Sequence, residues 1–313
     1  MPVPHTVIEA MTQGFYEYWN YTKHSLMNPS LYNPLYYLLL VYATTFVAES
    51  IFPKMLPYST IKRKGFWTDI LYVIFMDYLI AVIGLYAFTC GVEFLVFAFF
   101  HRLHIPTPVL HLDKLPPVLK FIIFFLIIDF LQWLAHFGLH RINFLWQFHK
   151  IHHAQETLGF ASTRHFHFGE YILLKPATWI PFALCGFKAG NYVIYYIWIG
   201  YFLTFLSHCN IKINWGILKY IFITPETHYW HHASNIPGKY GVNYASSLVI
   251  WDLMFGHFFN PKNKTPKLGI PNNNVPSNMT GQFLYPFRTL FATDNELTEN
   301  KSQGEIIKIK KKI

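Results

Sequence analysis

A strongly apolar stretch that runs straight into a series of histidines constrains this chain more than any other feature. Residues 129–153 read DFLQWLAHFGLHRINFLWQFHKIHH, with histidines spaced by four, then three and one. If the stretch is helical, these spacings place the imidazoles of each segment on one helix face. Imidazole is a common ligand of zinc, iron, copper and nickel. The pattern therefore predicts metal ligands at His136, His140, His149, His152 and His153.

A second histidine set with the same HxxHH spacing follows further along the chain, at His228, His231 and His232. The eight histidines exceed the four ligands of one tetrahedral zinc, so the two sets predict two metals in a shared site. Soluble di-iron proteins build such a site from Glu and ExxH motifs on four helices. That carboxylate pattern is absent from this sequence. We therefore expect a metal site made mainly of nitrogen ligands.

Other polar residues are candidates for the same site. His208 ends an apolar piece and is a further candidate ligand, and one of His165 and His167 could also contribute. Asp129 lies seven residues before His136, about two helical turns, and fits either a partner for the second nitrogen of a histidine or a helix-end cap or interface residue. Weaker candidates for that role, each of which also fits a solvated or capping residue, are Asp252, Glu156, Glu170 and Glu226.

The composition indicates a membrane protein. The chain is 53% hydrophobic and 13% charged, whereas an average soluble domain is roughly 25% charged. The apolar runs predict an all-α, polytopic membrane protein with about four to five membrane helices and a helical cytosolic cap that carries the metal site. The run at 70–100 fits either one long tilted helix or a tight hairpin. The runs cover residues 31–52, 70–100, 118–135, 171–187 and 191–206.

The charge pattern predicts the orientation of the chain. The net charge is +9, and the basic residues cluster beside apolar runs and at the C-terminus, which suits an anionic membrane leaflet rather than nucleic acid. Lys62, Arg63 and Lys64 place the loop after the first run in the cytoplasm. If the run at 70–100 crosses once, the histidines face the same side, as we expect; a hairpin there would put them outside. We expect an N-terminal membrane region at 1–116, a catalytic domain at 117–260, and a C-terminal loop and basic tail at 261–313.

These motifs resemble the fatty acid hydroxylase and sterol desaturase superfamily of membrane oxygenases. The resemblance implies that the eight core histidines hold two irons that activate O2, and that His208 is a further family histidine. It also implies that Asn243 and Asp252 lie around the site, together with Tyr244, Trp251 and Gly256. The matching stretches are DFLQWLAHFGLHRINFLWQFHKIHH, TRHFHFGE, LSHCN, TPETHYWHHAS and GVNYASSLVIWDLMFG, in the family's order.

The chain departs from the family pattern at two places. The family reads Arg-x-His-Pro where this chain has Arg164-His165-Phe166-His167-Phe168, so one residue is inserted and the proline is missing. This departure puts the role of His167 in doubt. His257 stands where a small polar residue is more usual, and we expect it to be structural.

The resemblance implies an O2-dependent di-iron oxidoreductase that hydroxylates or desaturates a membrane lipid. The dimetal centre itself would be the catalytic group, with no separate acid or base and no residues for an organic cofactor. The sequence has no HPGG-type cytochrome b5 module and no GxGxxG fingerprint. Electrons would then come from a separate partner such as cytochrome b5, a ferredoxin or a reductase fed by NAD(P)H. A pterin would serve instead if the chain resembles the members that cleave ether lipids.

The implied location is a bacterial inner membrane, or the endoplasmic reticulum in a eukaryote, where the final residues Lys310–Ile313 would fit a dilysine retrieval signal. A metal transporter is an alternative of another class, but it predicts histidines in the middle of spans, whereas these lie at span ends. A zinc hydrolase would need a Glu in an HExxH-like setting, and the sequence has none.

Overall fold

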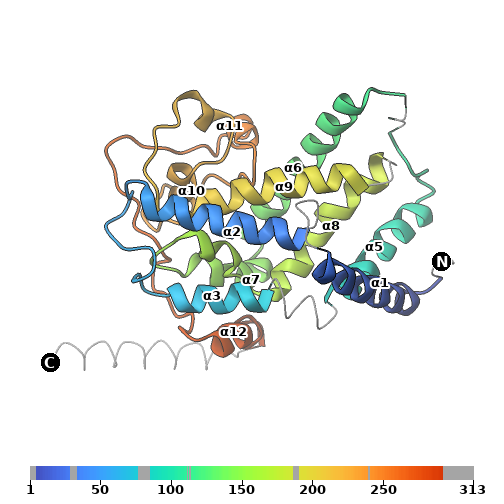
Figure 1. Cartoon of the computed structure of the whole chain (residues 1–313), viewed down its shortest axis with the longest axis horizontal. Helices are drawn as coiled ribbons and strands as arrows, with labels where there is room; N and C mark the ends of the chain where they lie inside the picture. Colours follow the sequence, from blue (N-terminus) through green and yellow to red (C-terminus); the bar gives the residue numbers. More distant parts are fainter. Residues whose placement is uncertain are drawn as a thin grey trace.

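The computed structural model of the chain describes residues 5–28, 34–76, 85–110, 112, 114–185, 190–238 and 240–291. Over these residues the regular structure is helical, with two isolated bridges and no named strand, which confirms the all-α prediction. Figure 1 shows the long helices beside a region of loops and short helices. The α-helices are α1 (Val7–Met27), α2 (Pro34–Ile51), α3 (Phe66–Ile74), α5 (Leu85–Arg102), α6 (Pro117–Arg141), α7 (Asn143–His153), α8 (Phe168–Cys185), α9 (Gly190–His208), α10 (Pro225–His231), α11 (Ile250–Met254) and α12 (Met279–Phe291). Two 3-10 helices are η2 (Phe160–Arg164) and η3 (Gly216–Tyr220).

Helix α6 is the one helix of the described residues that is long and apolar enough to cross a membrane. It has 25 residues, starts with Pro117 in its first turn, and carries His136 and His140 near its C-terminal end. Proline suits this first position because its missing N–H would have no partner within the helix. The expectation of four to five spans stays a prediction, and the junction at 77–84 that would separate one span from a hairpin lies outside the described residues.

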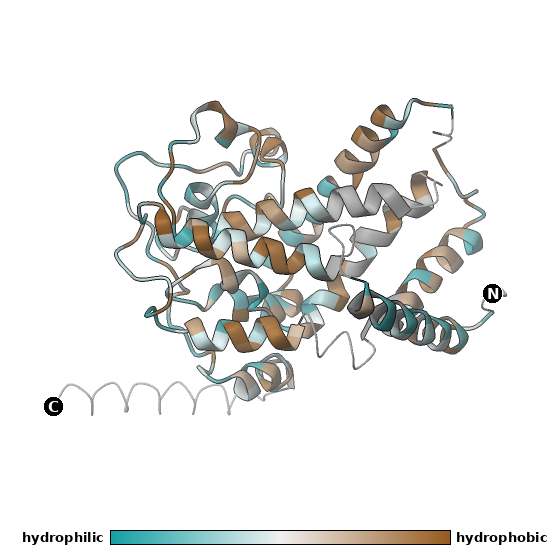
Figure 2. Cartoon of the chain, viewed as in Figure 1, coloured by the Kyte–Doolittle hydropathy of each residue, from teal (hydrophilic) through white to brown (hydrophobic). Residues whose placement is uncertain are grey.

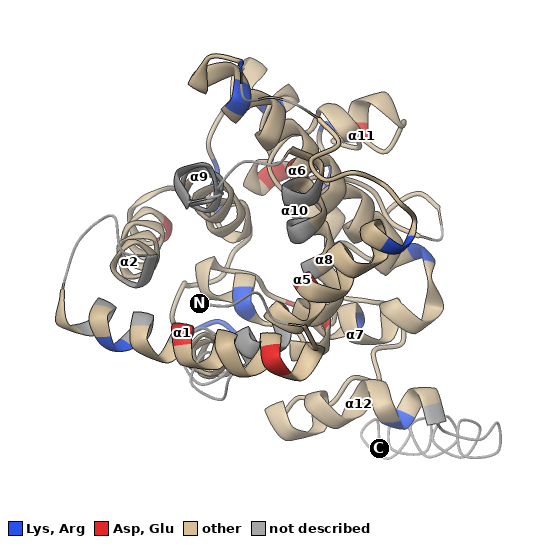
Figure 3. Ribbon diagram, turned by 90° about the vertical axis from the view of Figure 1, so that its right-hand side faces the viewer, with Lys and Arg blue, Asp and Glu red and all other residues tan. Residues whose placement is uncertain are grey.

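The helices predicted as further membrane pieces pack around α6. Helix α8 packs against both α6 and α5, α2 lies along α9, and α1 lies along α5. Figure 2 shows strongly apolar stretches along α2 and α3, and Figure 3 shows that charged residues are sparse along most of the helices. Apolar helices of this kind suit a lipid surrounding, because scattered charges would be costly there.

The chain reverses direction between α6 and α7, and this turn brings two histidine segments together. Ile142 interrupts the helix in an extended conformation, with φ −96° and ψ 113°. Helix α7 then folds back and buries His149, His152 and His153. Because α6 and α7 meet at this break, histidines from both helices face the same interior.

The region after α9 is less regular than the helical cap predicted from sequence. It holds the short helices η3, α10 and α11 within long loops. Helix α10 is well defined: Thr224 caps it by accepting a hydrogen bond from the backbone N–H of Thr227, and Pro225 occupies its first turn. The glycine- and proline-rich sequence of this region explains the loops, since both residues interrupt helices. The C-terminal tail from residue 292 lies outside the described residues.

One basic residue behind the predicted orientation is buried. Arg63 forms an ion pair with Asp69, and both side chains are about 1% exposed. Arg63 is therefore no surface charge, and the orientation rests on the lysines at 54, 62 and 64. The cytosolic face of the site and the three-part division of the chain stay predictions.

Candidate metal centre

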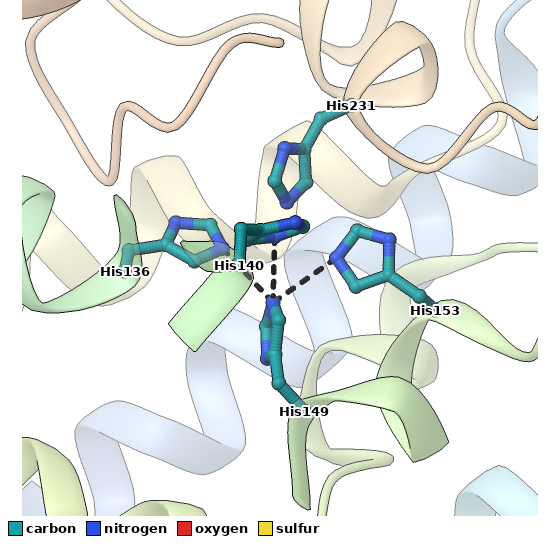
Figure 4. Close-up of side chains that lie close together, drawn as sticks. All are labelled: His136, His140, His149, His153 and His231. Carbon is teal, nitrogen blue, oxygen red and sulfur yellow. Dashed lines mark hydrogen bonds between the residues drawn. The ribbon is translucent and has the colours of Figure 1, made fainter. Parts of the chain in front are cut away.

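Nine buried or half-buried histidines gather in two groups. The five-histidine group consists of His136, His140, His149, His153 and His231, and the four-histidine group consists of His152, His208, His228 and His232. Within each group, one ring nitrogen of every member lies within 4.8 Å of the others. Figure 4 shows the five-histidine group with its rings directed toward one another. The structure thus brings together the eight core histidines and His208.

Each HxxHH motif divides its rings between the two groups. Helix α7 gives His149 and His153 to the five-histidine group and His152 to the four-histidine group. At α10 the division is reversed, because His231 joins the five-histidine group. This exchange follows from helix geometry: residues four apart share a face, and the residue between them is rotated away.

The spacing of the imidazole nitrogens fits metal coordination. In the five-histidine group, Nε2 of His149 lies 3.1 Å from Nε2 of both His136 and His140, and 3.0 Å from Nε2 of His153. In the four-histidine group, Nε2 of His228 lies 3.0 Å from that of His208. Two nitrogens bound to one metal at about 2.0–2.1 Å would be about 2.8–3.4 Å apart for right-angle to tetrahedral geometry.

A buried nitrogen without a partner supports this fit. Nδ1 of His231 hydrogen-bonds the carbonyl of Val242 at 2.8 Å, whereas its Nε2 has no hydrogen-bond partner although it is buried. Figure 4 shows the His231 ring directed into the five-histidine group. A buried nitrogen of this kind costs free energy unless it finds a partner. A metal ion among these rings would supply that partner.

Backbone carbonyls hold the outer nitrogens of several rings. Nδ1 of His136 lies 2.9 Å from the carbonyl oxygen of Tyr244, Nδ1 of His152 lies 3.1 Å from that of His165, and Nδ1 of His208 lies 2.8 Å from that of Thr204. Donation from Nδ1 to a carbonyl leaves the lone pair on Nε2, which then faces the centre of each group.

Asn243 holds the loop whose carbonyls, at Val242 and Tyr244, contact His231 and His136. It has a positive φ of 56°, a conformation that asparagine tolerates better than most residues. Its side-chain amide donates to the carbonyls of Thr227 and Phe259 at 2.8 and 2.7 Å. The carbonyls on either side of it, at Val242 and Tyr244, accept from His231 and His136. Asn243 therefore lies beside the site, as the resemblance implied, without reaching a metal position.

Asp129 does not contact His136, contrary to the sequence prediction. Its Oδ2 accepts hydrogen bonds from Trp251 Nε1 at 2.9 Å and from the backbone of Leu248 at 3.2 Å. Seven residues along a helix correspond to about 10.5 Å, too far for a hydrogen bond even on the same face. Asp129 instead fixes the segment that leads into α11.

Asp252 acts on the site only through the backbone. Its carboxylate accepts from Trp133 Nε1 and from the backbone N–H groups of Tyr244 and Ala245, each at 2.9 Å. These bonds hold Tyr244, whose carbonyl accepts from His136. His257 packs its ring near those of Trp133 and Tyr244, as expected of a structural residue.

Neither His165 nor His167 places its ring in a histidine group. Both ring nitrogens of His165 are engaged, one by Asp69 and the other by Gln282 at 3.0 Å. Nε2 of His167 donates to the carbonyl of Phe283, and its Nδ1 accepts from Gly169 N, both at 2.9 Å. The structure therefore does not place either ring as a metal ligand, and the carbonyl of His165 contacts His152 from behind.

Glu170, a weak candidate from the sequence, contacts a histidine of the five-histidine group. Its Oε2 lies 3.1 Å from Nδ1 of His149, and both side chains are almost fully buried. The one available signal was a carboxylate next to an apolar run, and the same signal also drew attention to Asp129. Glu156, by contrast, is exposed and pairs with Lys64.

Burial sets the protonation of the histidine groups. It lowers the pKa of the α7 and α10 histidines well below the usual value, and neighbouring imidazoles lower the pKa further. Their rings are therefore neutral at neutral pH, which is the form that binds metals.

Comparison with known proteins finds a family that resembles the histidine-bearing part of the chain. Residues 121–257 match the model of the fatty acid hydroxylase family, and this range holds all nine histidines. This part of the chain, which is less than half of its length, is similar to the fatty acid hydroxylase family. No solved structure matches it.

Several curated relatives fall within the same superfamily. The chain is 32% identical to the ornithine lipid hydroxylase OlsE of Rhizobium tropici over 56% of this chain and 52% of that protein. It is 32% identical to the alkylglycerol monooxygenase of Xenopus tropicalis over 45% of this chain and 30% of that protein. It is 26% identical to methylsterol monooxygenase 1-3 of Arabidopsis thaliana, over 44% of this chain and 47% of that protein. The matches thus span about half or less of each relative.

Proposed function

We propose that this chain is a membrane-bound oxygenase that hydroxylates or desaturates a lipid with two iron ions. One observation carries the proposal: nine histidines form two adjacent groups whose nitrogen spacings fit two metal ions. When bound, the irons would supply the activation of O2 and the oxidation of a C–H bond. The five-histidine group would hold one iron and the four-histidine group the other.

The chain's own residues would position the metals and exclude water. The carbonyls of Val242, Tyr244, His165 and Thr204 fix ring orientation, so the ligands need little rearrangement when a metal binds. Because most of the rings are buried, bulk water has little access to the centre. Exclusion of water protects a reactive centre from side reactions.

The position of the site favours an apolar substrate. His136 and His140 lie near the C-terminal end of α6, which is apolar enough to cross a membrane. A lipid could reach the centre sideways along such a helix. The names of the relatives are also those of enzymes that act on lipids, which supports this substrate class. We expect electrons to arrive from a separate redox protein, such as cytochrome b5, a ferredoxin or an NAD(P)H-dependent reductase.

A second candidate within the same superfamily is an ether-lipid monooxygenase that takes its electrons from a pterin. The similarity to alkylglycerol monooxygenase favours it. A metal transporter is less well supported, because most of these histidines are buried in two compact groups rather than spread along a path through the described helices.

The metal content of the purified protein tests the proposal first. The chain in detergent should hold about two irons per polypeptide, following the two groups, and a His152→Ala, His231→Ala double variant should lose them. A His257→Ala variant is the matched control, because it removes an imidazole beside the site but outside both groups. Unchanged metal in the double variant would refute the metal site.

The reaction itself is tested with labelled oxygen. The iron-loaded protein, supplied with a reductase and lipid extracts, should incorporate one oxygen atom from O2 into a lipid or remove two hydrogens from it. Mass spectrometry separates these two outcomes. A pterin-dependent product from an ether lipid would select the second candidate, and no lipid oxidation under either electron supply would refute the proposed activity.

A further inference from the structure

A buried carboxylate contacts the five-histidine group from outside. Oε2 of Glu170 lies 3.1 Å from Nδ1 of His149, with side-chain exposures of 7% and 2%. Neither atom has a hydrogen-bond partner, so this ion-pair contact is the one polar contact that each makes among the described residues. The opposite nitrogen of the same ring, Nε2, lies within about 3.1 Å of Nε2 of His136, His140 and His153. Glu170 therefore touches the ring that is nearest to the other ligands.

A close packing of two helices brings Glu170 to this position. Helix α8 starts at Phe168, and Glu170 lies in its first turn. The preceding residue is Gly169, where a Cβ would lie only 2.7 Å from the ring of Phe148 on α7. A glycine is required for this approach, because any side chain would push α8 away from α7. The close contact in turn sets the distance from Glu170 to His149.

The four-histidine group has no such partner among the residues that the structure describes. Nδ1 of His152 and of His208 meets a backbone carbonyl, and Nδ1 of His228 and of His232 has no hydrogen-bond partner. The two groups thus differ both in the number of imidazoles and in the presence of a carboxyl group against an outer ring nitrogen.

We infer that Glu170 is a positioning residue that makes the five-histidine group the tighter of two unequal metal sites. The inference rests on the proposed function, since it assumes that both groups bind metal. A carboxylate that accepts from the outer nitrogen of a ligating histidine fixes the ring and makes its inner nitrogen a stronger donor, and losing it typically weakens metal binding roughly 10–100-fold.

A metal titration tests this assignment without measuring activity. Metal-free protein in detergent is titrated with Co²⁺, and its absorption spectrum follows each site as it fills. The wild type should show two binding steps of different affinity. Glu170→Gln should weaken the tighter step roughly 10–100-fold and leave the weaker step unchanged. The matched control is Glu156→Gln, which removes an exposed carboxylate whose partner is Lys64.

The outcomes separate a positioning role from a structural one. A Glu170→Gln variant that weakens both steps equally, or neither, overturns the inference. If metal-free Glu170→Gln loses helical structure by circular dichroism, Glu170→Asp takes its place: it keeps the charge with a shorter reach and should weaken only the tighter step. An equal effect of Glu170→Asp on both steps would also overturn the inference. A wild type that binds no Co²⁺ would instead refute the proposed function.

Discussion

At the residue scale, the exchange of rings between the two HxxHH motifs determines how each histidine affects the metals. His231 serves the five-histidine group, whereas its neighbours His228 and His232 serve the four-histidine group. One substitution should therefore empty one site and leave the other largely filled. We expect His231→Ala and His228→Ala each to retain about one metal ion per chain, measured by elemental analysis. If either single variant lost both metals, the two groups would not be separate sites.

The lowered pKa of the buried histidines predicts how stability depends on pH. Unfolded histidines take up protons below about pH 6.5, whereas burial keeps those of α7 and α10 neutral to lower pH. The unfolded state then binds more protons, so the free energy of unfolding falls as the pH drops through about 6.5. For each such histidine the loss is about 1.4 kcal/mol per pH unit at most.

Metal-free protein should therefore unfold at a lower denaturant concentration at about pH 5.5 than at about pH 7.5. Bound metal should also be released more readily on acidification, because protons compete for the same nitrogens. If the metal-free protein were equally stable at the two pH values, the histidine rings could not be buried in their neutral form.

The stability that Asn243 provides can be divided into a backbone part, from its positive φ, and a side-chain part, from its hydrogen bonds. Asn243→Ala loses the hydrogen bonds to Thr227 and Phe259 and leaves buried carbonyls unpaired, which should cost about 1–3 kcal/mol. Asn263 also has a positive φ, of 57°, but it is exposed. Asn263→Ala therefore measures the backbone effect alone. Chemical denaturation of both variants should show the larger loss for Asn243→Ala, and equal losses would remove the side-chain role.

At the scale of elements, sequence patterns predict the helices well but their contacts poorly. The apolar runs at 118–135 and 191–206 lie within α6 and α9, because apolar content depends on neighbouring residues alone. The histidine groups were also predictable, since their spacing is periodic. The contact of Glu170 with His149 and the pair of Arg63 with Asp69 were not, because each depends on how separate elements pack.

The position of α11 beside α6 predicts that part of the presumed cytosolic region meets lipid. The ring of Phe130 on α6 lies near those of Trp251 and Phe255, at 5.0 and 6.3 Å. Phe130 precedes His136 by about 9 Å along the helix, within the apolar part of α6. Met254 is 64% exposed on this side of the molecule, so we expect it to lie against the acyl chains.

A photoreactive benzoyl-phenylalanine at position 254 should cross-link to lipid in native membranes. The same residue at position 235, where an exposed asparagine hydrogen-bonds the carbonyl of Thr265, is the control and should cross-link far less. Mass spectrometry of the adducts measures the amount of lipid cross-linked at each position. Equal lipid labelling at both positions would contradict the placement of position 254 against lipid.

At the scale of the whole molecule, a buried polar network joins the N-terminal region to the metal centre. Asp69 binds Arg63, the hydroxyl of Ser162 and the ring of His165. The other ring nitrogen of His165 contacts Gln282 of α12, which also accepts from the hydroxyl of Tyr72. Because the His165 carbonyl holds His152, residues far from the histidine motifs in the sequence help to fix a ring of the four-histidine group.

Removing the carboxylate at the centre of this network should therefore affect both stability and metal binding. Asp69→Ala leaves Arg63 buried without its partner, and breaking a buried ion pair in this way costs about 3–5 kcal/mol. The matched control is Glu156→Ala, because Lys64 and Glu156 form an exposed pair whose loss should cost less than about 1 kcal/mol. Denaturation of the metal-free proteins measures this difference. In the loaded protein, Asp69→Ala should weaken the four-histidine site more than the five-histidine site, since the freed His165 backbone holds only His152. A variant that lost stability while both sites kept their relative affinities would confine the network to a structural role.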